Sequence, residues 1–118
     1  MGLSGEWENQ NGSVLRIGPV ENGAFEGTFL STKGRAVRNR GYPVRGTVNG
    51  ELLAFAVDFA DDVDNLHSIS NFTGRLHDGV LHTVWVLARE FEDAERTKPT
   101  QPWNTFIVNA DRFVKRAG

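Results

Sequence analysis

Short stretches in which hydrophobic and polar residues alternate recur along the chain, about every 8–12 residues, with turn residues between them. Alternation with a period of two is typical of β-strands that bury one face. The pattern predicts eight strands, at residues 5–10, 13–18, 24–31, 42–48, 51–59, 67–77, 80–90 and 104–114. No segment shows a convincing helical period, so the expected class is all-β.

Dipeptides typical of two-residue hairpin turns separate three pairs of strands: Asn22-Gly23, Asn49-Gly50 and Asp78-Gly79. A two-residue turn at the third dipeptide places Phe72 opposite Trp85. The same turn at the second places Val44 opposite Phe55. These registers bring the apolar residues of both hairpins onto one face.

The connection at Asn22-Gly23 is less regular, because a strict two-residue loop would turn Arg16 toward the core face. The preceding Gly18-Pro19 favours a longer or bulged connection. A bulge lets Leu15 and Ile17 point inward, and this is the register that we expect.

Eight antiparallel strands in up-and-down order are expected to close into one barrel, a single domain over residues 1–118. The interior of such a barrel is just wide enough for side chains or one small ligand. The expected inward positions include polar residues among several aromatic ones: Asn9, Ser13, Ser31, Ser68, Ser70 and Asp111. Polar groups that converge inside an apolar cup suit a small polar ligand.

Asn9 lies two residues after Trp7, so the two side chains share one strand face. An unpaired amide that is buried costs about 1–3 kcal/mol. Either another side chain or a ligand must therefore satisfy Asn9.

Composition narrows the classes of partner. The net charge is −2, which gives no indication of nucleic acid or an anionic membrane as partner. The chain has no cysteine, which excludes disulfides, thiolate chemistry and cysteine-based zinc sites. No apolar run approaches the roughly 20 residues of a membrane span.

Five segments carry a resemblance in order and in spacing: Gly5-x-Trp7-x-Asn9-x-x-Gly12-Ser13, Gly27-Thr28-Phe29-x-Ser31, Ser68-x-Ser70-x-Phe72-Thr73-Gly74, Thr83-x-Trp85-x-Leu87, and Trp103 followed by Asp111-x-Phe113. They resemble the avidin and streptavidin family of biotin-binding barrels, over nearly the whole chain. The segment from Tyr42 to Gly50 resembles the rhizavidin-like members of that family. The resemblance implies high-affinity, non-catalytic binding of biotin in the barrel mouth, with no metal or cofactor, in a secreted or periplasmic protein.

The same resemblance implies how the ureido group of biotin is held. Asn9 and Ser13 would donate to its oxygen, and Ser31 and Asp111 would accept from its two N–H groups. In the family a tyrosine hydroxyl supplies a third donor, and here Phe29 stands at that position. Without the resemblance, Asp111 would be interpreted as a surface residue of a strand.

The other implied contacts are apolar walls from Phe59, Phe72, Trp85 and Leu87, Ser70 near the sulfur, Ser68 near the carboxylate, and Lys33 and Arg35 in a loop that attracts the carboxylate. Each of these has a plainer interpretation. The aromatic residues could be core, the serines ordinary strand residues, and the two cations the charges of any exposed loop.

Two other functions remain open from the sequence. A lipocalin-like carrier of an apolar ligand would leave the inward polar groups unpaired. An enzyme would need an acid–base or nucleophilic group in the pocket. His77 and His82 are expected on the outer face, and His67 at the start of a strand, so no such group is indicated.

The outer face of strand 80–90 is expected to be mostly apolar, and alternate residues of strand 104–114 extend the stripe: Val80, His82, Val84, Val86 and Ala88, with Phe106, Val108 and Ala110. Such a stripe usually marks an interface between copies. We expect a homo-oligomer, with a tetramer favoured over a dimer. In tetrameric relatives the residue that matches Trp103 caps a neighbour's biotin; the alternative is that it covers its own barrel rim.

Overall fold

The computed structural model describes residues 2–31, 41–60, 67–91 and 95–116. Within these ranges the chain forms eight strands and one short 3₁₀ helix: β1 (Gly5–Asn9), β2 (Val14–Ile17), β3 (Ala24–Leu30), β4 (Gly41–Asn49), β5 (Leu52–Asp58), β6 (Ser68–His77), β7 (Val80–Arg89), η1 (Pro102–Thr105) and β8 (Phe106–Lys115). The first and last residues of every strand lie within two residues of the predicted positions. The last strand starts two residues late because η1 occupies residues 102–105.

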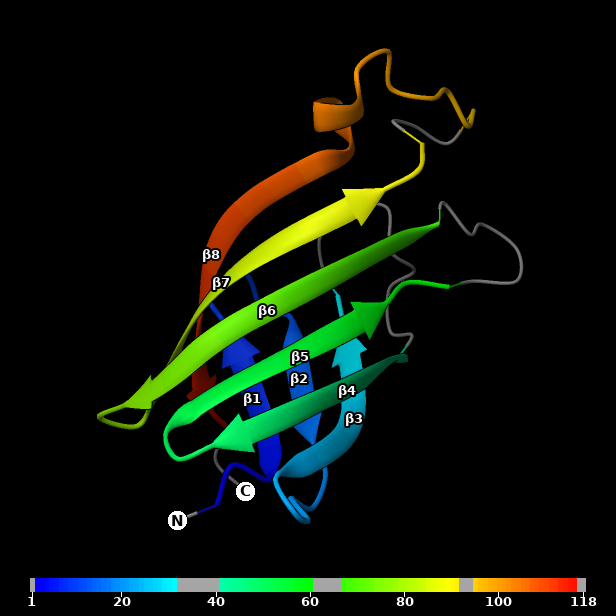
Figure 1. Ribbon diagram of the computed structural model, residues 1–118. Helices are drawn as coiled ribbons and strands as arrows, with labels where there is room; N and C mark the ends of the chain where they lie inside the picture. Colours follow the sequence, from blue (N-terminus) through cyan, green and yellow to red (C-terminus); the bar gives the residue numbers. More distant parts are fainter. Residues whose placement is uncertain (1, 32–40, 61–66, 92–94, 117–118) are drawn as a thin grey trace.

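The strands follow one another around a closed antiparallel barrel, which confirms the predicted fold class and strand order (Figure 1). β1 pairs with β8, from Trp7 opposite Lys115 to Asn9 opposite Phe113. The Trp7 ring lies at this seam, and its indole N–H donates to the Leu3 carbonyl at 2.8 Å. Figure 1 shows both chain termini at one end of the barrel and η1 at the other.

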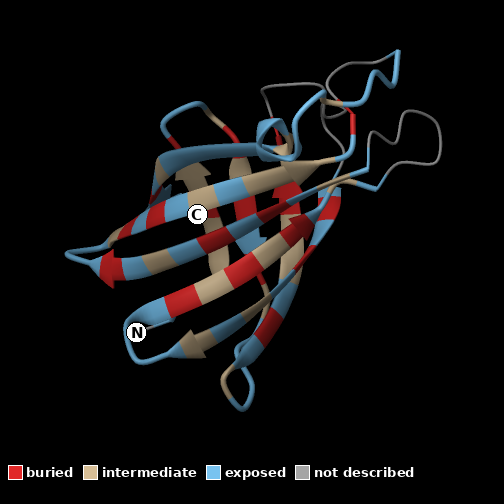
Figure 2. Cartoon of the chain, turned by 45° about the horizontal axis from the view of Figure 1, so that its top comes forward, coloured by how far each residue is buried: buried red, intermediate tan, exposed pale blue. Residues whose placement is uncertain are grey.

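Buried and exposed residues alternate along the strands, as the sequence pattern predicts (Figure 2). The interior is dominated by aromatic residues, among them Phe25, Phe29, Tyr42, Phe55, Phe72 and Phe113. Phe55 and Phe72 are stacked, with ring centroids 4.5 Å apart. Among the described residues, those that are buried and polar are Asn9, Ser13, Ser31, Ser70 and Thr83.

The hairpin of β6 and β7 has the predicted register, with Phe72 opposite Trp85 and Leu76 opposite Leu81. Both turn residues, Asp78 and Gly79, have positive φ angles of 50° and 76°. A type I′ turn requires positive φ at both positions.

The hairpin of β4 and β5 differs from its prediction. Val44 pairs with Val57 instead of Phe55, because the turn residues are Gly50 and Glu51 and the last pair is Asn49 with Leu52. Gly50 has a φ of 62°, as the first central position of a type II′ turn requires. Each residue of β4 thus pairs with a residue of β5 that lies two positions later in the chain than predicted, so the inward face is unchanged.

The connection between β2 and β3 combines a tight turn with a bulge. Asn22 and Gly23 both have positive φ, and Glu21 exchanges two backbone hydrogen bonds with Ala24. One residue is inserted between this bridge and the strand pair in which Ile17 faces Gly27. The insertion confirms the predicted bulge and keeps Leu15 and Ile17 buried.

No helix in the described part of the chain is long and apolar enough to cross a membrane.

Candidate functional site

The amide of Asn9 is fixed by the turn that follows β1. Its Oδ1 accepts hydrogen bonds from the backbone N–H groups of Asn11 at 3.0 Å and Ser13 at 2.9 Å. With the oxygen held in this way, Nδ2 points toward β8 and donates to Asp111 Oδ2 at 3.3 Å. One amide N–H is thus used within the protein, and the second can be offered to a ligand.

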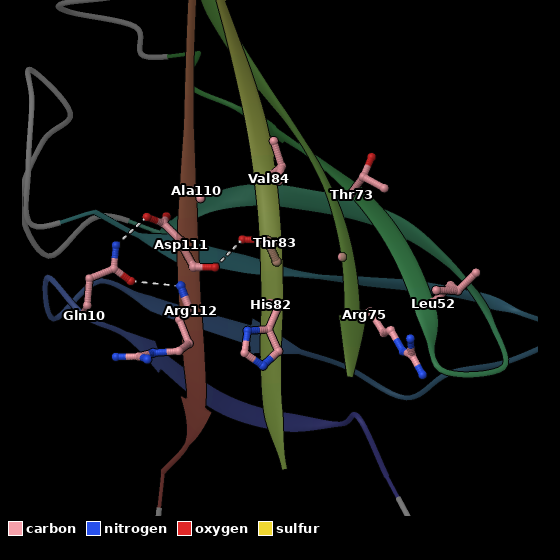
Figure 3. A pocket seen from close by; sticks show the side chains of 11 residues that line it. Gln10, Leu52, Thr73, Arg75, His82, Thr83, Val84, Ala110, Asp111 and Arg112 are labelled. Carbon is pink, nitrogen blue, oxygen red and sulfur yellow. Dashed lines mark hydrogen bonds between the residues drawn. The ribbon is translucent and has the colours of Figure 1, made fainter. Parts of the chain in front are cut away.

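Asp111 lies on β8 beside Asn9, half-buried, and both of its carboxylate oxygens are hydrogen-bonded. Figure 3 shows the contact of the carboxylate with Gln10. Gln10 Nε2 donates to Oδ1 at 2.7 Å, while Asn9 holds Oδ2. The hydroxyl of Thr83 donates to the backbone carbonyl of Asp111 at 3.0 Å. The carboxylate therefore belongs to a hydrogen-bonded network and is not an isolated surface charge.

The aromatic residues predicted to form walls, Phe59, Phe72 and Trp85, form one cluster with Phe29, from β3, β6, β7 and the residue after β5. Phe29 lies 6.2 Å from Phe59 and 6.1 Å from Phe72 between ring centroids. Phe72 lies 6.2 Å from Trp85. Among the described residues, Trp85 Nε1 is buried without a hydrogen-bond partner, so this wall contains a donor that a ligand could satisfy.

The predicted serines line the same interior. Ser13 and Ser70 are buried, Ser31 is buried at the end of β3, and Ser68 is half-buried at the start of β6. The half-buried Leu87 lies opposite Ser70. These residues surround the end of the barrel at which β1 and β3 finish.

Two other predicted residues, Lys33 and Arg35, lie outside the described residues. Trp103 is in η1 with 69 % of its surface exposed, the most exposed of the large hydrophobic residues described. Its indole does not lie buried against its own barrel.

Sequence reasoning assigned no role to Gln10 or Thr83, which both bond to Asp111. Thr83 lies in one of the recognised segments, and its inward position in the β7 alternation was the available signal. Gln10 is the turn residue that follows Asn9 at the end of β1, and it carried no signal. Only the closure of β8 against β1 reveals its contact.

A hollow of about 620 Å³ lies on the outside of the sheet (Figure 3). It is lined by residues of β5 to β8 and by Gln10: Leu52, Thr73, Gly74, Arg75, His82, Thr83, Val84, Ala110, Asp111 and Arg112. His82 lies here, on the outer face as predicted. Within the described ranges, no group of three or more His, Cys, Asp or Glu could hold a metal ion.

Comparison with known proteins agrees with this architecture. Rhizavidin has a TM-score of 0.80 and 27% identity, covering 97% of this chain and 82% of that chain. A rhizavidin–biotin complex has a TM-score of 0.77 and 26% identity, covering 99% and 94%. A bradavidin2–biotin complex, at 24% identity and a TM-score of 0.79 over 99% and 100%, supports the fold alone. The family comparison matches residues 1–116 to the Avidin family, and the chain therefore belongs to the avidin family.

Proposed function

We propose that this protein binds biotin without catalysis, in the barrel mouth lined by Asn9, Asp111 and the aromatic wall. The observation that carries the proposal is the contact between Asn9 Nδ2 and Asp111 Oδ2 at 3.3 Å, inside a closed barrel. This pair presents an N–H donor and a carboxylate acceptor side by side. A ureido group needs both, because it has one oxygen acceptor and two N–H donors.

Membership of the avidin family and the biotin complex of rhizavidin support the same ligand. A lipocalin-like carrier of an apolar ligand is less consistent with the site. Such a ligand would leave the Asp111 carboxylate and buried serines facing an apolar surface, which is costly.

Isothermal titration calorimetry with biotin tests the proposal directly. We expect one site per chain, together with a change in tryptophan fluorescence because Trp85 forms part of the wall. Absence of binding, with the barrel folded by circular dichroism, would overturn the proposal. An apolar fatty acid that bound where biotin did not would favour the carrier.

Phe29→Tyr is expected to slow the dissociation of biotin by about 2- to 12-fold, the effect of one neutral hydrogen bond. Phe29 is buried beside Phe59 and Phe72, so a hydroxyl added to its ring would enter the site. Surface plasmon resonance would measure the off-rate. An unchanged or faster off-rate would show that the added hydroxyl does not reach the ureido oxygen.

The proposal includes a homo-oligomer, in which a second copy covers the outer face of β7 and β8. This face carries an apolar stripe of exposed residues, with Val84 55 %, Phe106 56 % and Val108 64 % exposed. Stripes of this kind usually mark an interface between copies. We further propose a tetramer in which the exposed Trp103 completes the site of a neighbouring copy.

Val84→Arg is expected to reduce the oligomer to smaller species, because it introduces a charge into the centre of the stripe. Light scattering at micromolar concentration would measure the mass. Val20→Arg is the matched control, since Val20 is also exposed but lies in the β2–β3 connection. A parent protein that is a monomer, with unchanged biotin affinity in Trp103→Lys, would contradict both parts of the assembly proposal.

A further inference from the structure

The backbone pairing between β1 and β8 stops at Asn9 opposite Phe113, whereas β8 remains paired with β7 as far as Phe106. Within the described residues, the part of β8 between η1 and Phe113 therefore does not pair with β1. The first residue past the end of the ladder is Arg112. Its backbone N–H donates to Gln10 Oε1 at 2.9 Å. The Gln10 side chain thus takes the place of the next backbone acceptor on β1.

The same Gln10 amide also holds Asp111. Its Nε2 donates to Asp111 Oδ1 at 2.7 Å, the shortest of the contacts to this carboxylate (Figure 3). The two ends of the amide therefore match two neighbouring groups, a carboxylate that can only accept and a backbone N–H that can only donate. If the amide were rotated by 180°, its NH₂ group would face the backbone N–H of Arg112, and its oxygen would face the Asp111 carboxylate. Neither pair could form a hydrogen bond, so the orientation of the amide is determined.

Gln10 and Asn9 hold the carboxylate from opposite sides. Asn9, on the inside, bonds to Oδ2, and the exposed Gln10 bonds to Oδ1. A carboxylate fixed at both oxygens cannot rotate about its Cβ–Cγ bond without breaking one of these contacts. Because each oxygen can accept a second hydrogen bond, the group keeps capacity for a ligand N–H.

We propose that Gln10 is a positioning residue, which orients the Asp111 carboxylate before the ligand arrives. We call its two contacts, to Asp111 Oδ1 and to Arg112 N–H, the Gln10 clamp. Asp111 and Gln10 both line the outer hollow. The inference rests on the proposed function, since biotin is the ligand that the carboxylate would accept from. A carboxylate that is already oriented raises the affinity, because less side-chain entropy is lost when the ligand binds.

A double-mutant cycle tests whether Gln10 acts through Asp111. Gln10→Met keeps the length of the side chain and removes both hydrogen bonds. We expect it to raise the Kd for biotin by about 5- to 20-fold in the parent and by less than about twofold in the Asp111→Ala background. Gln101→Met is the matched control, because Gln101 is exposed and makes no side-chain capping bond, and its Kd should equal that of the parent.

The clamp has a second readout that needs no ligand. In the unliganded protein, the NMR resonances of the Gln10 side-chain amide are expected to shift in Asp111→Ala, while those of Gln101 stay unchanged. Absence of that shift would overturn the clamp. Equal effects of Gln10→Met in both backgrounds would overturn its action through Asp111.

A parent that binds no biotin would overturn the proposed function and the ligand part of this inference, while the amide resonances would still decide whether the clamp exists.

Discussion

Asp111→Ala is expected to raise the dissociation constant for biotin by about 10- to 150-fold, because it removes a charged acceptor worth about 1.5–3 kcal/mol. The carboxylate accepts hydrogen bonds from Asn9 and Gln10 and keeps capacity for a further N–H donor. Its loss also leaves the Asn9 amide without its partner. Calorimetry on the variant and the parent would give the difference.

A pair of matched variants separates this effect from a general change of charge. Asp111→Asn keeps one acceptor oxygen and should fall between the parent and the alanine variant. Asp78→Asn makes the same change in the β6–β7 turn at the far end of the barrel and should leave the affinity unchanged. Thermal unfolding should show that both proteins remain folded. Equal binding by Asp111→Ala and the parent would remove Asp111 from the site.

The barrel itself was predictable because alternation and turn residues are local signals. The β6–β7 hairpin followed from Asp78 and Gly79, whose positive φ angles determine the register of ten residue pairs. The bulge before Asn22 followed from a packing conflict, since the strict register would have buried the exposed Arg16.

The β4–β5 register was wrong because one dipeptide is compatible with two turns. Gly50 can be the second residue of a type I′ turn or the first of a type II′ turn, and Asn49-Gly50 does not distinguish them. Choosing the wrong turn left every residue on its correct face. Because side chains alternate between the two faces of a strand, a pairing that is shifted by two residues leaves each side chain on its predicted face.

In the candidate site, most of the residues that sequence identified stand on inward positions of recognised segments, and Phe59 is an exception. Gln10 was missed because its contacts join residues that are 101 and 102 positions apart in the chain. Nothing local in the sequence predicts that β8 continues beyond the end of β1. The proposed role of Trp103 involves a second copy, which a single chain does not contain.

Gly27→Ala is expected to destabilise the protein by about 3 kcal/mol, at the upper end of the cost of overpacking. A Cβ at this position would lie 1.9 Å from the backbone oxygen of Arg16 and 3.0 Å from its carbonyl carbon. Backbone atoms in a paired strand cannot turn aside as a flexible side chain can. The pairing of β2 with β3 at Ile17 and Gly27 would have to open next to the bulge.

Gly41→Ala provides the control, because Gly41 is also a strand glycine and pairs with β3. Its added Cβ would meet the Thr28 side chain at 3.4 Å, an ordinary contact, and should change stability by less than about 0.5 kcal/mol. Urea unfolding of both variants at one protomer concentration would measure the difference, since an oligomer's stability depends on concentration. Because Phe29 and Ser31 follow Gly27 on β3 and at its end, we expect weaker biotin binding in Gly27→Ala as well. Equal stability of the two variants would mean that β2 and β3 can separate at this point without loss of the barrel.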